Sequence, residues 1–275
     1  MNLQAYLDRI HFEGTPHVDV ETLKRVHRQH LLQIPYENLD VQLENKSDIS
    51  VEKAYDKIVG RGRGGWCYEM NGLLGWALGE IGFDMMRMTG GVMREMAGDT
   101  VLGNHLVLST QLDGITWLVD VGFGDGQLEP TPLVPGEFSQ GFLDFRLEHM
   151  DDGFWRFHNH PYGGAKSFDF RYEPTDETSL MKQCQWLQSA PESMFVQNLV
   201  CQRFRPEHIT VLKGRSLAKV SASGQTKTLL ESVEAFEKTL SDKFNLSFER
   251  EQIDRLWTRV LARHEELFGA DDNSG

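Results

Sequence analysis

The sequence contains one cysteine whose neighbours suit it to nucleophilic chemistry. Cys67 follows the glycine-rich string RGRGGW (61–66), at a position where a helix is expected to begin. The unpaired N–H groups and the positive end of a helix N-terminus stabilise a thiolate and lower the pKa of a cysteine. A free cysteine is equally often a small buried core residue. The position of Cys67 alone therefore leaves a nucleophile and a core side chain as equal alternatives.

A predicted β-hairpin brings a histidine and an aspartate together. The strings HLVLSTQL (105–112) and ITWLVDV (115–121) flank an Asp-Gly pair, which is a strong signal for a tight hairpin. A two-residue loop makes His105 and Asp120 diagonal neighbours on one face, about 7–8 Å apart at their backbones. A three-residue loop would move them to opposite faces. The two-residue hairpin therefore predicts a hydrogen bond between these side chains.

Cys67, His105 and Asp120 would together activate a thiol. In such a triad the histidine takes the proton of the cysteine and the acid orients the histidine. The structural alternatives are a half-buried strand histidine and an acid left at a strand end. Because an acid inside the apolar string WLVDVGFG (117–124) is costly to bury unless it is paired, the pattern favours the catalytic interpretation. Several cysteine enzymes of different folds share the same chain order, so the order alone is weakly specific.

The elements that must position these residues form an α+β pattern. Helical spacing covers residues 19–33, 50–59 and 67–81, with Asp19 and Ser50 as predicted N-caps. Short β segments run from about 85 to 172, and two more strands are expected at 208–214 and 215–222. Two helices (231–243 and 249–268) and a polar tail (270–275), expected to be disordered, end the chain. This order, without βαβ alternation, predicts an α+β protein built from adjoining units.

Composition excludes several classes of protein. The chain has 28 basic and 41 acidic residues, a net charge of −13, which argues against nucleic acid as a partner. It has no apolar run of about 18 residues and no signal-peptide pattern at its start, so we expect no membrane association. Its 3 cysteines include no CxxC pair and form neither a disulfide framework nor a zinc site. His158 and His160 are expected to be structural, so no metal is predicted, and the expected location is cytoplasmic.

Several strings resemble the arylamine N-acetyltransferase family, and the similarity spans nearly the whole chain. They are IPYENLD (34–40), RGGWCYEMNGLL (63–74), NHLVL (104–108), WLVDVGFG (117–124) and, more weakly, NLVCQRF (198–204). The resemblance implies a helical bundle (1–84) that carries the cysteine and a central β-barrel (85–190) that carries the histidine and aspartate. An interdomain segment and an α/β lid (191–275) would follow. By the same resemblance, Cys67 is the acetylated nucleophile, His105 its base and Asp120 the group that orients the histidine.

The resemblance also implies which residues meet the substrates. Aromatic side chains matching Tyr36, Trp66, Phe123 and Phe204 line the acceptor pocket. The family usually has phenylalanine in place of Tyr36, and often phenylalanine or tyrosine in place of Trp66, and both changes bear on amine selectivity. Gly124 would leave room for the pantetheine arm of CoA, and Gly103 is also expected at the CoA site. A basic cluster (Arg203, Arg205, Lys213 and Arg215) either meets the CoA phosphates or forms a solvated strand edge.

The expected reaction is a ping-pong acetyl transfer without a metal. Acetyl-CoA would acetylate Cys67, and the acetyl group would pass to the nitrogen of an arylamine, an arylhydrazine or a hydrazide, as in xenobiotic metabolism. The alternatives are a transglutaminase-like or protease-like cysteine hydrolase, a non-catalytic ligand-binding module, and an amide-forming relative from secondary metabolism. The sequence leaves open the physiological amine, the preferred acyl group and the oligomeric state, including a homo-oligomer.

Overall fold

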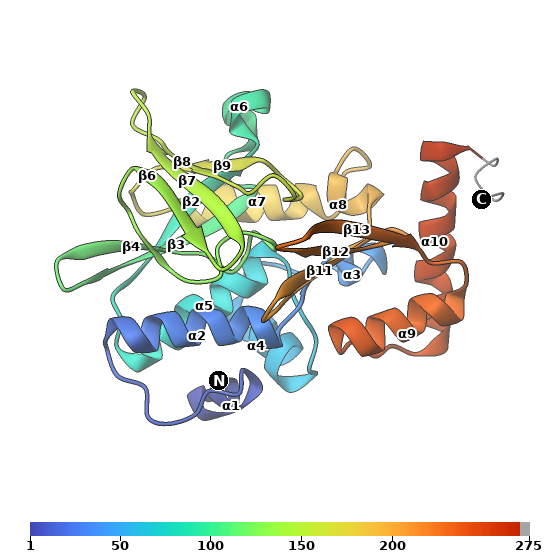
Figure 1. The fold of residues 1–275 in the computed structure, drawn as a ribbon, viewed down its shortest axis with the longest axis horizontal. Helices are drawn as coiled ribbons and strands as arrows, with labels where there is room; N and C mark the ends of the chain where they lie inside the picture. The colour runs from blue at the N-terminus through green and yellow to red at the C-terminus, as the bar shows by residue number, and fades with distance from the viewer. Residues whose placement is uncertain (270–275) are drawn as a thin grey trace.

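The computed structural model describes residues 1–269; the predicted disordered tail (270–275) lies outside these residues. The N-terminal region is helical, as its apolar spacing predicts. Its elements are α1 (Leu3–Arg9), α2 (Val20–Gln33), α3 (Leu39–Gln42), α4 (Val51–Tyr55), the π-helical turn η1 (Asp56–Gly60) and α5 (Cys67–Ile81) (Figure 1).

The predicted helix starts are confirmed by side-chain caps. Asp19 accepts a hydrogen bond from the backbone N–H of Thr22, and Ser50 accepts one from Lys53. Such bonds satisfy N–H groups that have no partner inside the helix. The third helix begins at Cys67 and ends at Ile81, as expected. The nucleophile candidate therefore lies at a helix N-terminus.

An antiparallel sheet of 8 strands follows and curls into a half-barrel, in the order β5-β4-β3-β2-β9-β8-β7-β6 (Figure 1). Helix α5 packs on β2 and β3. The strands are β2 (Met85–Val92), β3 (His105–Leu112), β4 (Ile115–Val119), β5 (Thr131–Pro132), β6 (Gly136–Gln140), β7 (Leu143–His149), β8 (Trp155–His158) and β9 (Ser167–Phe170).

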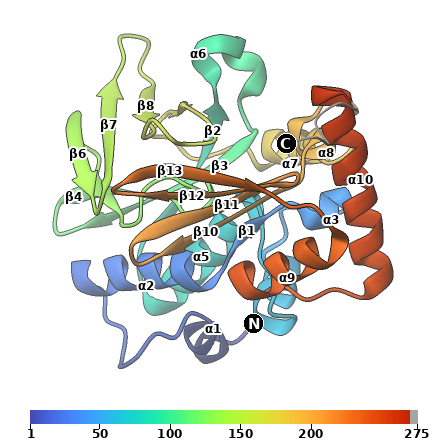
Figure 2. The ribbon, with the colours of Figure 1, turned by 45° about the vertical axis from the view of Figure 1, so that its right-hand side comes forward.

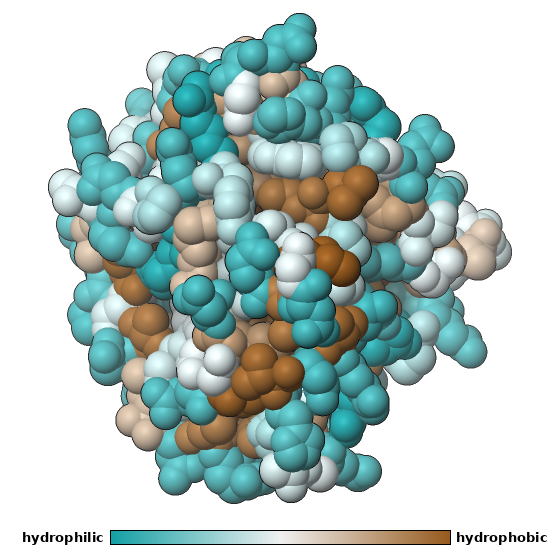
Figure 3. All heavy atoms as spheres, turned by 90° about the vertical axis from the view of Figure 1, so that its left-hand side faces the viewer, coloured by the Kyte–Doolittle hydropathy of each residue, from teal (hydrophilic) through white to brown (hydrophobic). Residues whose placement is uncertain are grey.

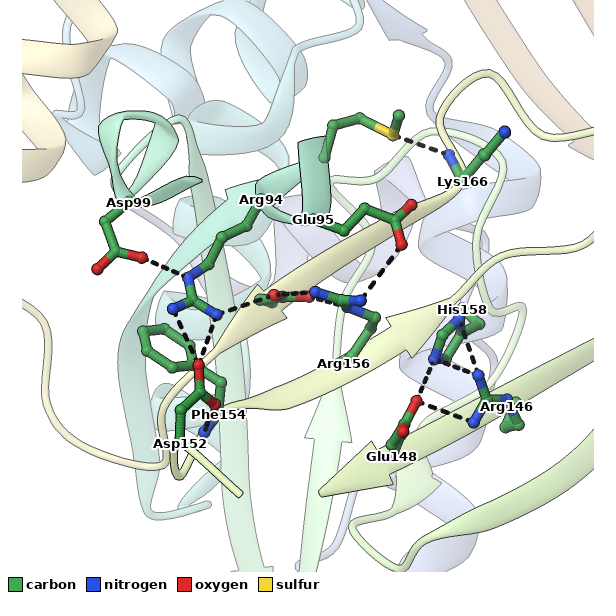
Figure 4. A network of polar contacts seen from close by, with 12 residues as sticks. Arg94, Glu95, Asp99, Arg146, Glu148, Asp152, Phe154, Arg156, His158 and Lys166 are labelled. Atoms are coloured by element: carbon green, nitrogen blue, oxygen red, sulfur yellow. Dashed lines mark hydrogen bonds and ion pairs between the residues drawn. The ribbon is translucent and has the colours of Figure 1, made fainter. Parts of the chain in front are cut away.

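A polar network fixes a short helical insertion to this sheet (Figure 4). The insertion, α6 (Arg94–Ala97) and η2 (Gly98–Val101), lies between β2 and β3. The fully buried carboxylate of Asp169 accepts hydrogen bonds from Arg156 Nε at 2.7 Å and from Arg94 at 3.3 Å. Arg94 also stacks on the Phe154 ring at 3.7 Å. Because each buried charge is paired, the network can hold the segment that leads into β3.

A second antiparallel sheet of 5 strands joins the two ends of the chain, in the order β1-β10-β11-β12-β13. Its first strand, β1 (Tyr36–Glu37), comes from the helical region and was not predicted; Tyr36 pairs with Gln202. The other strands are β10 (Val200–Arg205), β11 (His208–Lys213), β12 (Ser216–Ser221) and β13 (Gly224–Leu229). Helices α7 (Glu177–Leu187) and α8 (Met194–Gln197) precede this sheet. The last two helices, α9 (Val233–Phe244) and α10 (Arg250–Phe268), lie beside it (Figure 2).

Two large apolar clusters and a smaller one fill the interior. The largest extends from α1 and α2 through α5 into the curled sheet, and the second joins the C-terminal helices to β10 and β11. The smallest surrounds Cys67. On the outside, Figure 3 shows brown apolar patches separated by hydrophilic groups on the face at the left of Figure 1. The fold is thus a mixed helix and sheet structure, as predicted, with Cys67 packed inside it.

Candidate active site

Cys67 is the first residue of α5 and is only 2% exposed. Its thiol lies 3.7 Å from the backbone oxygen of Asn104, the residue before His105. Two residues further on, the Glu69 carboxylate accepts a hydrogen bond from the backbone N–H of Trp66 at 3.2 Å. This bond pairs an N–H at the start of the helix. The helix start is therefore held rigidly around the thiol.

The glycine-rich run before Cys67 lets another segment approach closely. A Cβ at Gly64 would overlap the backbone oxygen of Pro35. The N–H of Glu37 donates to the oxygen of Gly65 at 2.9 Å. Residues 35–37 consequently lie directly against the run, which brings Tyr36 into the apolar cluster around Cys67.

A buried cluster of charges lies beneath the start of α5. Lys57 Nζ is 2.8 Å from Glu69, 3.0 Å from Asp40 and 3.6 Å from Glu37, and Arg63 lies 2.7 Å from Glu37. Burial works to lower the pKa of Lys57, but the three carboxylates around it together raise it above its ordinary value. Each of these five side chains has an opposite charge close by, as buried ions require. The cluster ties η1, β1, α3 and α5 into one unit.

The hairpin that carries the histidine and aspartate forms as predicted. Leu112 pairs with Ile115 across a two-residue loop, in which Asp113 has a φ of 53°. The predicted hydrogen bond is also confirmed, since His105 Nε2 lies 2.6 Å from Asp120 Oδ2. Both side chains are 1% exposed. A short bond to a buried carboxylate fixes the orientation of the imidazole and leaves Nδ1 as its free nitrogen.

The second carboxylate oxygen of Asp120 is held by two donors. The Asn71 side-chain amide lies 3.0 Å away and the backbone N–H of Gly122 lies 2.7 Å away. Asn71 also donates to the oxygen of Leu106 at 2.6 Å and accepts from Val121 at 2.8 Å. This residue was not identified from the sequence. Its signal was an amide one helical turn after Cys67, on a face that is otherwise apolar.

His27, on helix α2, contacts the backbone of the same aspartate. Its Nδ1 lies 3.0 Å from the backbone oxygen of Leu128, and its Nε2 lies 3.3 Å from the backbone nitrogen of Asp120, from which a neutral ring can accept a hydrogen bond. Burial lowers the pKa of His27 to about 4, although the bond to Leu128 and the Asp120 charge act in the opposite direction. His27 is therefore a neutral, buried link between α2 and the end of β4.

The pKa of the Cys67 thiol differs from the value expected at a helix N-terminus. We expected the helix N-terminus to lower its pKa; instead, burial raises it well above the ordinary value. The nearby Cys184 and the Asp120 charge add to the increase, whereas backbone N–H groups of Leu106 and Tyr68 oppose it. Desolvation of a fully enclosed thiolate outweighs the favourable helix end. Burial of the sulfur thus opposes the effect of the helix N-terminus.

The predicted aromatic residues fall into three places. Tyr36 and Trp66 belong to the cluster around Cys67. Phe123 packs edge-on against His105, with ring centroids 5.8 Å apart, and Phe168, which was not predicted, lies 5.0 Å from His105. Phe204 belongs to the main core cluster and not to the one around Cys67. The structure thus brings three of the four predicted aromatic residues to the Cys67–His105 region.

A cleft of about 700 Å³ lies between residues 161–164, strands β11–β13 and helix α10. Of the described residues that line it, five are basic and one, Asp125, is acidic; the basic residues are Lys213, Arg215, Lys227, Arg259 and Arg263. Arg203 and Arg205 point elsewhere, donating to the oxygens of Leu32 and Lys243. The predicted basic cluster is therefore divided, and only its second half lines the cleft.

The two predicted CoA glycines differ in their surroundings. Gly124 lies next to Asp125 of the cleft, with Gln202 and Tyr36 packed against it. Gly103 faces α7, because a Cβ there would lie 3.2 Å from the backbone oxygen of Ser179. The oxygen of Gly103 accepts a hydrogen bond from Tyr68 at 2.6 Å. The geometry therefore links Gly124, rather than Gly103, to the cleft.

Across residues 1–269, no three His, Cys, Asp or Glu side chains gather in a way that would hold a metal ion. His158 interacts with Glu148 at 2.8 Å, and His160 with the backbone oxygen of Asp125 at 2.9 Å. None of the helices in the described part of the chain is long and apolar enough to cross a membrane.

Comparison with known proteins identifies the family. A family model described as N-acetyltransferase matches residues 19–253. The liver isozyme of arylamine N-acetyltransferase from Gallus gallus is 31% identical, over 92% of this chain and 98% of its own. The arylamine N-acetyltransferase of Mycolicibacterium smegmatis is 36% identical, over 82% of this chain and 85% of its own.

Solved structures of arylamine N-acetyltransferases also resemble this chain. The Mycobacterium marinum arylamine N-acetyltransferase in complex with CoA superposes with a TM-score of 0.84 and 30% identity, covering 94% of this chain and 98% of the other. The chain therefore belongs to the arylamine N-acetyltransferase family.

Proposed function

We propose that this protein is an acetyl-CoA:arylamine N-acetyltransferase that works through acetyl-Cys67. Its acceptors would be arylamines, arylhydrazines or hydrazides. The observation that carries the proposal is the buried His105–Asp120 bond of 2.6 Å beside a cysteine at a helix N-terminus. The family membership points to the same activity.

The first half-reaction transfers the acetyl group to the enzyme. The Cys67 sulfur gives its proton to His105 and attacks the thioester carbonyl carbon. The carbon–sulfur bond to CoA then breaks, and His105 returns the proton to the departing thiolate. The backbone N–H of Cys67 is a candidate donor to the transient oxyanion. Asp120 would hold His105 in position through both steps.

The second half-reaction releases the acetyl group to the amine. The neutral amine nitrogen attacks the acetyl carbon, His105 accepts the amine proton, and the Cys67 thiol is regenerated. Tyr36, Trp66, Phe123 and Phe204 are proposed to line the acceptor pocket. The location of Tyr36, Trp66 and Phe123 near Cys67 and His105 supports this, because aromatic side chains pack favourably against an aromatic acceptor.

Acetyl-CoA is the proposed co-substrate, and the basic cleft is suited to its nucleotide. Five cations line the cleft in a chain whose net charge is −13. Such a local reversal of charge attracts phosphate groups. The CoA complex of the Mycobacterium marinum relative supports this choice of ligand. Gly124 and Gly103 are retained as proposed CoA contacts, and no metal is needed.

We also propose the domain boundaries, the cellular location and the physiological role of the protein. We assign the bundle to residues 1–84, the barrel to 85–190 and the interdomain segment with the lid to 191–275. A cytoplasmic location is supported by 3 free, buried thiols. A role in xenobiotic metabolism follows from the acceptor class. The cysteine-hydrolase, binding-module and amide-forming alternatives have less support, because family and site agree on N-acetyl transfer.

Intact mass after mixing with acetyl-CoA tests the proposal. The wild-type protein should gain one acetyl group, and an added arylamine should remove it with formation of the N-acetyl product. Cys67→Ala should gain nothing, whereas Cys184→Ala, which removes another buried thiol, should still be acetylated. A wild-type protein that forms no adduct with acetyl-CoA would overturn the assignment.

A further inference from the structure

Cys67 is separated from the basic cleft, although a short stretch of chain runs between them. Gly122 lies against Cys67, because a Cβ at Gly122 would be 2.9 Å from the Cys67 Cα. Asp125, three residues later, lines the cleft. Three residues span at most about 11 Å. Residues 122–125 therefore form a short connection between the cleft and the sulfur, along which a ligand in the cleft can reach Cys67.

One side chain occupies the middle of this stretch. A Cβ at Gly124 would overlap the side-chain amide oxygen of Gln202, and it would lie 3.4 Å from the Tyr36 ring. Gln202 and Tyr36 are paired residues on neighbouring strands of the C-terminal sheet. The space that Gly124 leaves by having no side chain is thus filled from the opposite sheet by Gln202.

Gln202 is held in that place by Asp125. The Gln202 Nε2 donates to Asp125 Oδ2 at 2.8 Å, and both residues are buried. Asp125 also accepts hydrogen bonds from the N–H of Gly164 at 2.7 Å and from Asn159 at 3.1 Å. A carboxylate fixed by several donors is a firm anchor for an amide.

We propose that Gln202 is an access-controlling residue that closes the path between the cleft and Cys67, and that Asp125 holds it closed. The inference rests on the proposed function, since the ligand that must pass is the acylated pantetheine arm of CoA. This arm is a linear chain that can replace the Gln202 side chain beside Gly124 once the amide rotates away. Until then the thiol is shielded from the solvent that fills the cleft.

The rate at which iodoacetamide alkylates Cys67 measures how accessible the thiol is, without the use of acyl-CoA. Gln202→Ala should raise the rate at Cys67 about tenfold, as expected when a side chain anchored by a hydrogen bond to a charged group is removed. Asp125→Asn keeps the shape of the side chain but leaves a single oxygen for the donors Asn159, Gly164 and Gln202. This variant should raise the alkylation rate less. Gln185→Ala, an exposed glutamine on α7, should not change it. Peptide mapping assigns the label among Cys67, Cys184 and Cys201.

The possible outcomes test the access-controlling role of Gln202 separately from the proposed function. If Gln202→Ala and Asp125→Asn react no faster than wild type, the access-controlling role is wrong, even where acetyl-CoA acetylates Cys67 normally. If the rate ratio disappears at high pH, the substitutions acted on thiol ionisation, and the role is again wrong. If wild type is never acetylated while both variants alkylate faster, the path is confirmed and the proposed function fails.

Discussion

The side chain of Asn71 donates a hydrogen bond to Asp120 Oδ1 at 3.0 Å, one helical turn below Cys67. The same carboxylate binds His105 through its other oxygen. Asn71 therefore connects the helix that carries the sulfur with the strand ends that carry the other two members of the proposed triad. This amide therefore contributes to the spacing among the three, together with the N–H of Gly122, which binds the same oxygen.

Replacement of Asn71 by alanine should lower both stability and acetyl transfer. The change leaves the oxygen of Leu106 and the N–H of Val121 without their partners. Buried groups left unpaired cost about 1–3 kcal/mol each, so for these two groups we expect the free energy of unfolding to fall by roughly 2–6 kcal/mol. Urea unfolding and the rate of Cys67 acetylation measure the two effects. An Asn71→Ala protein with wild-type values of both would show that the helix and strands hold their spacing without it.

Local patterns predicted much of this fold and of the proposed triad. The caps at Asp19 and Ser50 and the tight hairpin each depend on residues a few positions apart, and all three are confirmed. The His105–Asp120 bond followed because the hairpin loop fixes which strand residues share a face. Their catalytic roles stay predictions, as do those of the acceptor and CoA residues.

Long-range pairings could not be predicted in the same way. The pairing of Tyr36 with Gln202 joins distant parts of the chain, and no local spacing indicates it. The pKa of Cys67 shifts in the direction opposite to the one expected from the sequence, for a related reason. The helix end is visible in the sequence, whereas the burial that outweighs it comes from tertiary packing.

Replacement of Lys57 by methionine should strongly destabilise the protein. Lys57 is 4% exposed and contacts three carboxylates, which would be left as buried charges with only Arg63 to balance them. Removing one partner from a buried ion cluster costs about 3–5 kcal/mol. Lys53→Met is a matched control, because Lys53 is 67% exposed and pairs with Asp48 at the surface; its effect should be at most about 1 kcal/mol. Equal unfolding free energies for the two variants would contradict a structural role for the cluster.

Stability should fall in weak acid because of His27. Its pKa is about 4 in the folded protein, against 6.5 when exposed. Between these values the unfolded chain binds a proton that the native state does not, so lowering the pH favours unfolding. The loss from pH 7 to pH 4 should be about 3 kcal/mol from this residue. Chemical denaturation of wild type and His27→Gln across this range measures it, and parallel pH profiles for the two would contradict the assignment.

Cations of the cleft should affect the binding of acetyl-CoA but not the chemistry at the thiol. Lys213 and Lys227 line the cleft, so Lys213→Gln with Lys227→Gln should raise the KM for acetyl-CoA roughly five- to twentyfold, with kcat little changed. The effect should shrink at high salt, because added ions screen charges near the surface.

Lys219→Gln is the control, since this exposed lysine lies on β12 but does not line the cleft. The decisive comparison uses a short acetyl thioester without phosphates, whose KM should be the same in all three proteins. A rise in KM for that compound as well would place the effect of the two lysines at the thiol rather than at the CoA phosphates.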